Sequence, residues 1–347
     1  MPAVNRQIVM ARHPEGWVRE SDFALIETAR PAPGPGQILV RNVYLSLDPY
    51  MRGVMDPGRS YLAKVAPGGV MVGGTVGEIV ESDQPKFPVG AYVTGLLGWR
   101  EFSLSDGHGL WRVDPKRAPL STALGILGMP GVTAHIGLID IGKPSPGETV
   151  VISAAAGAVG ATVGQIAKLK GCRAVGIAGG PAKCDYAVGE LGFDACIDYK
   201  SADWADRLRA ATPERIDIYF ENVGGKILDE VLKRLNANAR IPLCGMISQY
   251  NLTRPEGIHN LTSLIVNRAR MQGFIVSDHL DRWPAALAEL GGWLAAGKLK
   301  YKEDIAEGLE NAPKAFIAMP SGKNFGKQLV RLGPDKLQQP VNRNAKS

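Results

Sequence analysis

The sequence predicts an α/β protein in two lobes, a β-rich first lobe followed by a doubly wound parallel sheet of about six strands. The chain has 347 residues, more than one hydrophobic core usually organises. Short β segments broken by Pro- and Gly-rich turns fill its first third. From about Gly147, strand-like and helix-like segments alternate regularly, which is typical of a parallel sheet.

The first lobe extends from Ile8 to roughly Arg112. Its most regular β segments are Gln37–Tyr44, Val70–Val80 and Tyr92–Leu97. Turns such as Pro31–Pro35 and Pro67–Gly69 separate them, so the lobe is predicted to be rich in strands.

The second lobe contains six predicted strands: Thr149–Ser153, Arg173–Ala178, Ala195–Tyr199, Ile216–Glu221, Arg240–Cys244 and Met271–Val276. Helices are predicted between them at Val159–Lys170, Ala182–Leu191, Asp203–Ala210, Lys226–Leu235 and Leu261–Arg268. The carboxyl ends of such strands form one edge of the sheet, where ligands of doubly wound proteins bind.

The segments after this sheet have no place in it. They follow a last helix, Trp283–Ala296, and are the stretch Leu299–Glu307, a helix at Ala312–Met319 and a strand at Lys327–Leu332. We expect them to return to the first lobe, which divides the chain into residues 1–125, 126–310 and a returning segment 311–347.

The composition favours an ordinary globular protein, with 45% hydrophobic and 21% charged residues. A net charge of +6 is spread over 40 basic and 34 acidic residues without a long block of one sign, which argues against a nucleic-acid partner. Met1–Pro14 has no signal-peptide pattern, and no apolar run reaches the ~20 residues that span a bilayer. We therefore expect a cytoplasmic protein with no membrane partner.

The cysteines and histidines do not predict a metal site. The four cysteines are Cys172, Cys184, Cys196 and Cys244, with no CxxC pair, and the histidines are scattered. Apolar neighbours indicate that the cysteines are buried and reduced.

The strongest local signal is the stretch Val150–Gly160, in which an apolar strand enters a turn of small residues that opens a helix. It matches GxGxxG except that Ala155 stands at the first glycine. Gly157 allows the backbone to approach a pyrophosphate, and Gly160 allows the helix to lie close to the sheet. A small-residue turn in a protein without a nucleotide is the alternative, but the surrounding alternation favours a phosphate-binding loop.

The end of the second predicted strand indicates which dinucleotide binds. NAD sites place an Asp or Glu there for the ribose hydroxyls, whereas this chain has Ala178-Gly179-Gly180. Without that carboxylate a 2′-phosphate is not repelled, and Lys183, five residues later, can reach it. The sequence thus favours NADPH over NADH, although a solvated lysine is the alternative for Lys183.

Four further motifs occur in a fixed order: Leu45–Arg52 (LSLDPYMR), Gly128–Ala134 (GMPGVTA), Phe220–Gly225 (FENVGG) and Cys244–Asn251 (CGMISQYN). Together with the phosphate loop they closely resemble the zinc-independent medium-chain dehydrogenase/reductases that include prostaglandin, alkenal double-bond and curcumin reductases. The resemblance extends from Asn5 to Leu332.

The resemblance implies a GroES-like lobe at 1–125, a Rossmann NADPH-binding lobe at 126–310, the return at 311–347 and a homodimer. The implied reaction is NADPH-dependent reduction of the carbon–carbon double bond of an α,β-unsaturated aldehyde or ketone. The implied cofactor contacts are Gly157, Ala158, Val159, Gly160, Lys183, Tyr199, Asn222, Cys244, Gly245, Met246, Ile247, Ser248, Tyr250, Phe274, Ile275, Val276 and Asn324. His135 departs from the aromatic residue expected in its motif.

Two of these contacts have equally good structural interpretations. Tyr199 follows the third strand of the sheet and could bond the 2′-phosphate, or it could be an aromatic residue at the sheet edge. Asn222 ends the fourth strand in an Asn-Val-Gly-Gly turn and could be there for the turn geometry.

Two tyrosines are candidates for the chemistry. Hydride addition to the β-carbon of an enone leaves negative charge on the carbonyl oxygen, and a protonated tyrosine hydroxyl can donate a hydrogen bond to it. Tyr250 is the first choice because it follows the fifth strand at the carboxyl edge. Tyr50, in the first lobe, is expected to contact the substrate; packing roles are the alternative for both rings.

Two rival functions stay open. A quinone or carbonyl reductase could use the same scaffold and cofactor, because a fold does not fix the acceptor. A non-catalytic NADPH-binding protein is the other, and NADPH consumption with an enone would exclude it.

Overall fold

The computed structural model describes residues 4–337, which form two compact units. The first, called here the β-rich unit, consists of the described residues of Met1–Leu124, Ile305–Met319 and Gln328–Ser347. The second, the parallel-sheet unit, consists of Gly125–Asp304 and Pro320–Lys327. None of the helices within residues 4–337 is long and apolar enough to cross a membrane.

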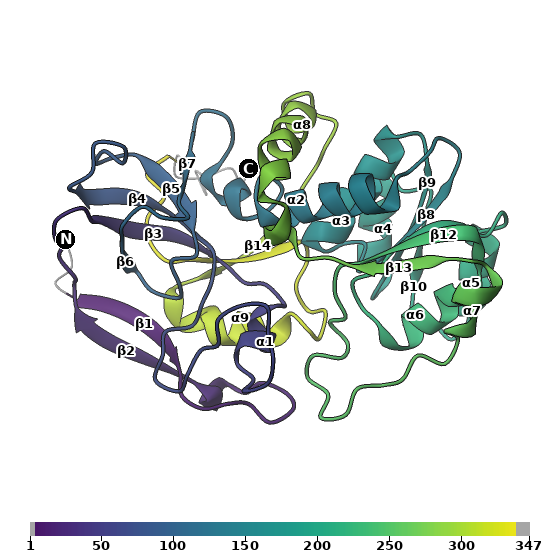
Figure 1. The fold of residues 1–347 in the computed structure, drawn as a ribbon, viewed down its shortest axis with the longest axis horizontal. Helices are drawn as coiled ribbons and strands as arrows, with labels where there is room; N and C mark the ends of the chain where they lie inside the picture. The colour runs from purple at the N-terminus through teal and green to yellow at the C-terminus, as the bar shows by residue number, and fades with distance from the viewer. Residues whose placement is uncertain (1–3, 338–347) are drawn as a thin grey trace, which may run out of the picture. The chain divides into compact units, whose positions relative to one another are not determined.

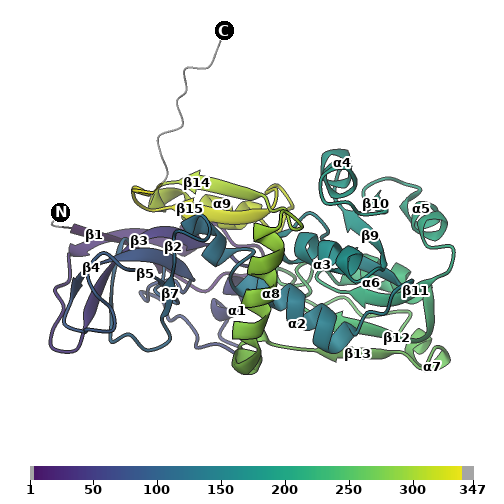
Figure 2. The same cartoon turned by 90° about the horizontal axis from the view of Figure 1, so that it is seen from above.

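The β-rich unit contains a hairpin and a larger antiparallel sheet. The hairpin pairs β1 (Val4–Met10) with β2 (Phe23–Ala29). The sheet has the order β14-β15-β3-β4-β5-β7, and β6 also pairs with β3. Its strands are β3 (Ile38–Ser46), β4 (Thr75–Ser82), β5 (Tyr92–Gly95), β6 (Phe102–Ser105), β7 (Trp111–Val113), β14 (Glu303–Glu307) and β15 (Lys327–Arg331). Figure 2 shows β14 and β15 beside helix α9 (Ala312–Ala318).

The core of the β-rich unit joins segments that are far apart in the sequence. The centroid of the Trp99 ring lies 5.6 Å from that of Phe23 and 5.8 Å from that of Phe316 in α9. Strand β15 pairs antiparallel with β3, with Val330 opposite Leu45. The late segment therefore supplies both a strand and core side chains.

The parallel-sheet unit has the strand order β10-β9-β8-β11-β12-β13, with every neighbouring pair parallel, which confirms the predicted six-stranded sheet. The strands are β8 (Thr149–Ser153), β9 (Arg173–Ala178), β10 (Ala195–Asp198), β11 (Ile216–Phe220), β12 (Leu235–Leu243) and β13 (Arg270–Gly273). The order reverses between β8 and β11, so the ends of these two strands form the switch point where such sheets bind ligands.

Helices cover both faces of this sheet (Figure 1). One face packs against α2 (Met129–Ile136), α3 (Ala158–Leu169), α4 (Pro181–Gly189) and α8 (Trp283–Ala295). The other packs against α5 (Trp204–Ala211) and α6 (Gly225–Leu232), and α7 (Thr262–Val266) precedes β13. The π-helical turn η3 (Gly137–Gly142) follows α2 in this unit, and the short helix α1 (Met51–Val54) belongs to the β-rich unit.

Three predicted strand boundaries are wrong by three residues or more. Strand β4 begins at Thr75, not Val70, because Gly73 passes so close to Trp99 that a Cβ would lie 2.9 Å from the indole. Strand β12 begins at Leu235, not Arg240, and continues through Asn238 with φ 62°. Strand β13 ends at Gly273, so the predicted contacts Phe274–Val276 follow the strand.

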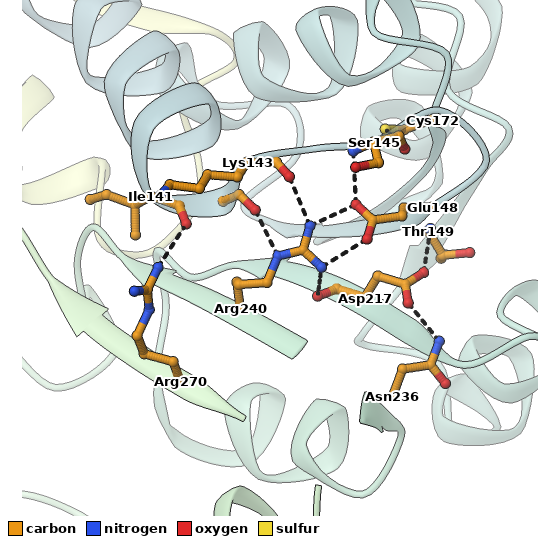
Figure 3. A network of polar contacts seen from close by, with 11 residues as sticks. Ile141, Lys143, Ser145, Glu148, Thr149, Cys172, Asp217, Asn236, Arg240 and Arg270 are labelled. Carbon is orange, nitrogen blue, oxygen red and sulfur yellow. Dashed lines mark hydrogen bonds and ion pairs between the residues drawn. The ribbon is translucent and has the colours of Figure 1, made fainter. Parts of the chain in front are cut away.

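At the amino edge of the sheet, Arg240 of β12 ties several segments together (Figure 3). Its guanidinium donates to both carboxylate oxygens of Glu148, at 2.8 and 2.6 Å. It also donates to the carbonyls of Gly142 at 2.8 Å and Lys143 at 2.9 Å. Lys143 has φ 52°, so Arg240 holds a strained turn between η3 and β8.

Candidate active site

The phosphate loop follows β8 and opens α3. Ala154 has φ 52°, and Gly157 is the N-cap of α3, with no side chain capping its free N–H groups. A Cβ on Gly160 would lie 2.4 Å from the carbonyl oxygen of Ala154, so only glycine fits there. The helix thus presents unpaired N–H groups beside a tight turn, as an anion-binding loop requires.

The predicted 2′-phosphate corner is at the ends of β9 and β10. The backbone of Gly179 runs against the Tyr199 ring, since a Cβ there would lie 3.0 Å from Cε1 and 3.2 Å from Cε of Lys200. Lys226 Nζ lies 5.6 Å from the centre of the Tyr199 ring. Burial, followed by the neighbouring ammonium of Lys200, lowers the pKa of Lys183. Cations and a tyrosine therefore converge on a glycine turn.

The carboxylate of Asp198, at the end of β10, accepts backbone N–H groups at this corner. Asp198 Oδ1 accepts the N–H groups of Gly180 at 2.8 Å and Lys200 at 3.0 Å. Although burial works against its charged form, these bonds lower the pKa of Asp198. The carboxylate holds the two turns together, and the basic side chains can face an anion.

The loop Cys244–Tyr250 is fastened to the turn after β11. Ile247 N–H donates to the Asn222 carbonyl at 3.1 Å, and Ser248 N–H donates to the Val223 carbonyl at 3.0 Å. Asn222 is itself fixed, because its Nδ2 donates to the Ser153 carbonyl at 2.8 Å. The structure thus brings together two predicted cofactor segments at the switch point of the sheet.

The Tyr250 hydroxyl accepts a hydrogen bond from Met246 N–H at 3.1 Å. This bond uses a lone pair of the oxygen and leaves its proton available to another acceptor. Burial raises the pKa of Tyr250, and the bond from Met246 works in the opposite direction. A Cβ on Gly245 would lie 3.0 Å from this hydroxyl, so the loop backbone shapes its surroundings.

Glu221 is a residue that our sequence analysis did not assign a role. Its side chain is fully buried, and Oε1 accepts Ser153 Oγ at 2.9 Å, Gly224 N–H at 3.0 Å and Val223 N–H. Burial raises its pKa, and the N–H groups of Val223 and Gly224 oppose this. Its backbone carbonyl accepts Cys244 N–H at 2.9 Å. Glu221 therefore holds the turn after β11 and the start of the Cys244–Tyr250 loop in place. In the sequence, the signal for such a role was an acidic residue at the end of an apolar strand.

The remaining predicted site residues are placed as follows. Asn324 Nδ2 donates to the Gly326 carbonyl, and Gly326 pairs with Gly157 of the phosphate loop. The Phe274 ring packs edge-on against Phe220, at 6.4 Å, in the core of the parallel-sheet unit. Tyr50 precedes α1 in the β-rich unit, where burial, followed by the charge of Asp48, raises its pKa.

A catalytic zinc ion needs three protein ligands such as Cys, His or a carboxylate. Between residues 4 and 337, no group of three or more His, Cys, Asp or Glu side chains is placed to hold a metal ion. The described residues therefore do not fit a zinc site. His135 is buried and its Nε2 lies 2.6 Å from Glu289, so it has a structural partner.

Comparison with known families gives two matches that cover most of the chain. Residues 6–113 match the family described as the N-terminal domain of oxidoreductase. Residues 158–291 match the family described as zinc-binding dehydrogenase, although the described residues lack a zinc ligand set.

Individual relatives match over nearly their whole length. NADPH-dependent curcumin reductase of Escherichia coli is 50% identical over 95% of this chain and 98% of its own. The 2-alkenal reductase (NADP(+)-dependent) of Nicotiana tabacum is 44% identical over 94% and 97%. The crystal structure of CurA in complex with NADPH from Vibrio vulnificus superposes with a TM-score of 0.91 at 50% identity, over 95% of this chain and 100% of that one. The chain therefore belongs to the medium-chain dehydrogenase/reductase family of oxidoreductases, in the zinc-independent branch that includes the curcumin and alkenal reductases.

Proposed function

We propose that this protein reduces the carbon–carbon double bond of an α,β-unsaturated aldehyde or ketone with NADPH. The chain is an NADPH-dependent oxidoreductase, and its relatives at 50% and 44% identity are named for curcumin and 2-alkenal reduction. The single observation that carries the choice of acceptor is the Tyr250 hydroxyl, whose oxygen is engaged by Met246 N–H and whose proton is available at the carboxyl edge.

Bound NADPH supplies the hydride that adds to the β-carbon of the substrate. Negative charge then collects on the carbonyl oxygen, and the Tyr250 hydroxyl donates a hydrogen bond to it. Because burial raises the pKa of Tyr250, the hydroxyl keeps its proton at neutral pH. The same proton can pass to the α-carbon directly or through water, which completes the reduction. Tyr50 is the residue proposed to contact the substrate.

The cofactor is held by the loops already described. The free N–H groups at the start of α3 face the diphosphate, with Gly157 and Gly160 permitting close approach. Lys183 and Tyr199 bind the 2′-phosphate at the corner where the Asp198 carboxylate accepts two backbone N–H groups. Asn222, the 244–250 loop, residues 274–276 and Asn324 complete the proposed contacts.

A panel of enals, enones, quinones and simple ketones, assayed with NADPH and with NADH, tests this proposal. Enals and enones should be reduced fastest, and NADPH should give at least ~10-fold higher kcat/KM than NADH. Activity should survive exhaustive chelation, because the described residues do not fit zinc. Preferential reduction of quinones would favour the rival reductase, and NADPH binding without turnover on any acceptor would favour a non-catalytic role.

We also propose that the protein is a homodimer. Strand β13 is the last in the order of the parallel sheet, and α7 beside it exposes Ile265 and Val266 at 79% and 66%. An open strand edge next to exposed apolar side chains is suited to pairing with a second copy.

A further inference from the structure

The segment Gly322–Gly326 lies against one face of helix α4. Lys183 Nζ donates to the Gly322 carbonyl at 2.7 Å. The Phe325 ring meets the Tyr186 ring edge-on, with centroids 5.0 Å apart and planes at 87°. Lys183 and Tyr186 are three residues apart on the helix and so share a face. Both contacts to the segment therefore come from neighbouring side chains of α4.

Phe325 is held from two further directions. Lys302 Nζ lies 3.9 Å from the centre of the Phe325 ring and 5.4 Å from the centre of the Tyr186 ring. Phe325 N–H donates to Asp304 Oδ2 at 3.2 Å. A cation over an aromatic face and an edge-on ring pair are both attractive arrangements. The Phe325 ring is thus the anchor of the segment.

The bond to Gly322 restricts a side chain that is otherwise flexible. A lysine ammonium is a compact charge on a four-carbon chain, with three N–H donors. One donor of Lys183 is used by Gly322, which leaves two for an anion. Fixing the side chain beforehand reduces the conformational entropy that is lost when the anion binds.

We propose that Phe325 is a positioning residue for cofactor specificity: it holds the Gly322 carbonyl in the place where that carbonyl orients Lys183 toward the 2′-phosphate of NADPH. This inference rests on the proposed function, which assigns Lys183 to the 2′-phosphate. Phe325 then acts, through the contacts of its ring with Tyr186 and Lys302, on the one group that distinguishes NADPH from NADH.

A purely structural role gives a different result. Gly326 pairs with Gly157 of the phosphate loop, and Asn324 is bonded to Gly326. If Phe325 only kept this segment folded, its loss would disturb the diphosphate region that NADPH and NADH share. Both cofactors would then lose affinity together, so the ratio of their dissociation constants separates the two roles.

The experiment measures Kd for NADPH and NADH by fluorescence titration of Phe325→Leu. NADPH should bind about fivefold more weakly and NADH within about twofold of the unaltered protein. Tyr186→Leu should reproduce this change, whereas Tyr186→Phe keeps the ring and should retain the original ratio. Ser321→Ala, an exposed site in the same stretch, is the matched control. Equal weakening of both cofactors, or an unchanged ratio in Phe325→Leu, overturns the proposal.

Combining substitutions separates this inference from the assignment of Lys183. Lys183→Ala should reduce the preference for NADPH, and adding Phe325→Leu should reduce it no further. If Lys183→Ala leaves the preference unchanged, the proposed 2′-phosphate site itself is wrong. If Lys183→Ala reduces it and Phe325→Leu does not, only the positioning role fails. Should Phe325→Leu fold poorly, Lys302→Met removes the exposed ammonium above the ring and should shift the ratio in the same direction.

Discussion

Tyr250 is the residue on which the proposed chemistry depends most. Replacing it by Phe removes the hydroxyl that Met246 N–H contacts and leaves the ring. We expect kcat for an enone to fall about 100-fold, because the forming oxyanion loses its donor, while NADPH affinity changes little. Single-turnover hydride transfer, followed by NADPH absorbance, measures this step directly.

Tyr301→Phe is the control for that measurement, since it removes a partly exposed hydroxyl elsewhere in the parallel-sheet unit. It should leave the single-turnover rate unchanged. The alternative donors are the hydroxyl of the nicotinamide ribose of NADPH, for the enolate oxygen, and water, for the proton. A rate for Tyr250→Phe within a few-fold of the unaltered protein would favour them and remove Tyr250 from catalysis.

Gly160 gives a second prediction at the scale of single residues. An alanine Cβ there would lie 2.4 Å from the Ala154 carbonyl, so Gly160→Ala must shift the phosphate loop. We expect Kd for NADPH to rise at least ~10-fold, because misplaced N–H groups bind the diphosphate poorly. Gly189→Ala, where nothing lies within 4 Å of the new Cβ, is the matched control. Unchanged NADPH binding in Gly160→Ala, in a folded protein, would contradict this view of the loop.

The order of the predicted strands was sufficient to place several candidate site residues at one edge of the sheet, but not to identify the residues that they contact. Gly160, Lys183 and Tyr250 follow predicted strands in order, so each could be placed at the carboxyl edge from periodicity alone. The pairing of Lys183 with Gly322 joins residues 139 apart in the chain, and no local pattern contains that information. The role of Glu221 likewise depends on Ser153, 68 residues away.

At the scale of elements, the attachment of β12 to the segment before β8 depends on Arg240. Arg240→Met removes its bonds to Glu148, Gly142 and Lys143 together. We expect the free energy of unfolding to fall by about 2–4 kcal/mol at neutral pH, since a partly buried carboxylate is left without its partner. Arg270→Met on β13 is the control, because that guanidinium makes one long bond, 3.4 Å, to the Ile141 carbonyl. Urea unfolding of both variants measures the difference.

The stabilisation that the Arg240–Glu148 ion pair provides depends on pH. Although burial works against the charged form, the bonds from Arg240 and Ser145 lower the pKa of Glu148 below its ordinary value of 4.5. A carboxyl whose folded pKa is lowered stabilises the protein above its unfolded pKa and loses that effect as the pH falls through the folded value. The stability gap between the unaltered protein and Arg240→Met should therefore narrow below about pH 4.5. A gap that widened in acid would show that Glu148 is not the charge involved.

Predicted and observed bounds agree best where a strand is buried along nearly its whole length. Strands β8 and β9 have the predicted bounds. The hairpin of β1 and β2 was not among the predicted segments, because most of β2 is exposed and lacks a regular apolar face. Strand β12 passes through Asn-Ala-Asn with a positive φ at Asn238, a combination that resembles a turn in sequence.

For the whole molecule, the proposed dimer predicts a mass in solution of twice one chain, measured by light scattering. Ile265→Glu combined with Val266→Glu places charges on the exposed face of α7 and should shift the protein toward monomer. Leu25→Glu is the control, because Leu25 is also exposed but lies on β2 of the β-rich unit. A monomeric unaltered protein, or a double variant that keeps the larger mass, would count against this interface.

The late strand and helix of the β-rich unit also determine the order in which the protein can form during synthesis. Residues 4–124 leave the ribosome without Phe316, which packs on Trp99, and without β15, which pairs with β3. Those parts emerge only after all of 125–304 has been translated, a delay of roughly 10–40 s at about 5–20 residues per second. Residues 125–304 of the parallel-sheet unit can therefore begin to fold first, while residues 4–124 still lack the packing of Phe316 and the pairing of β15. A ribosome-stalled nascent chain ending before Phe316 should accordingly be far more sensitive to protease in residues 4–124 than in 125–304.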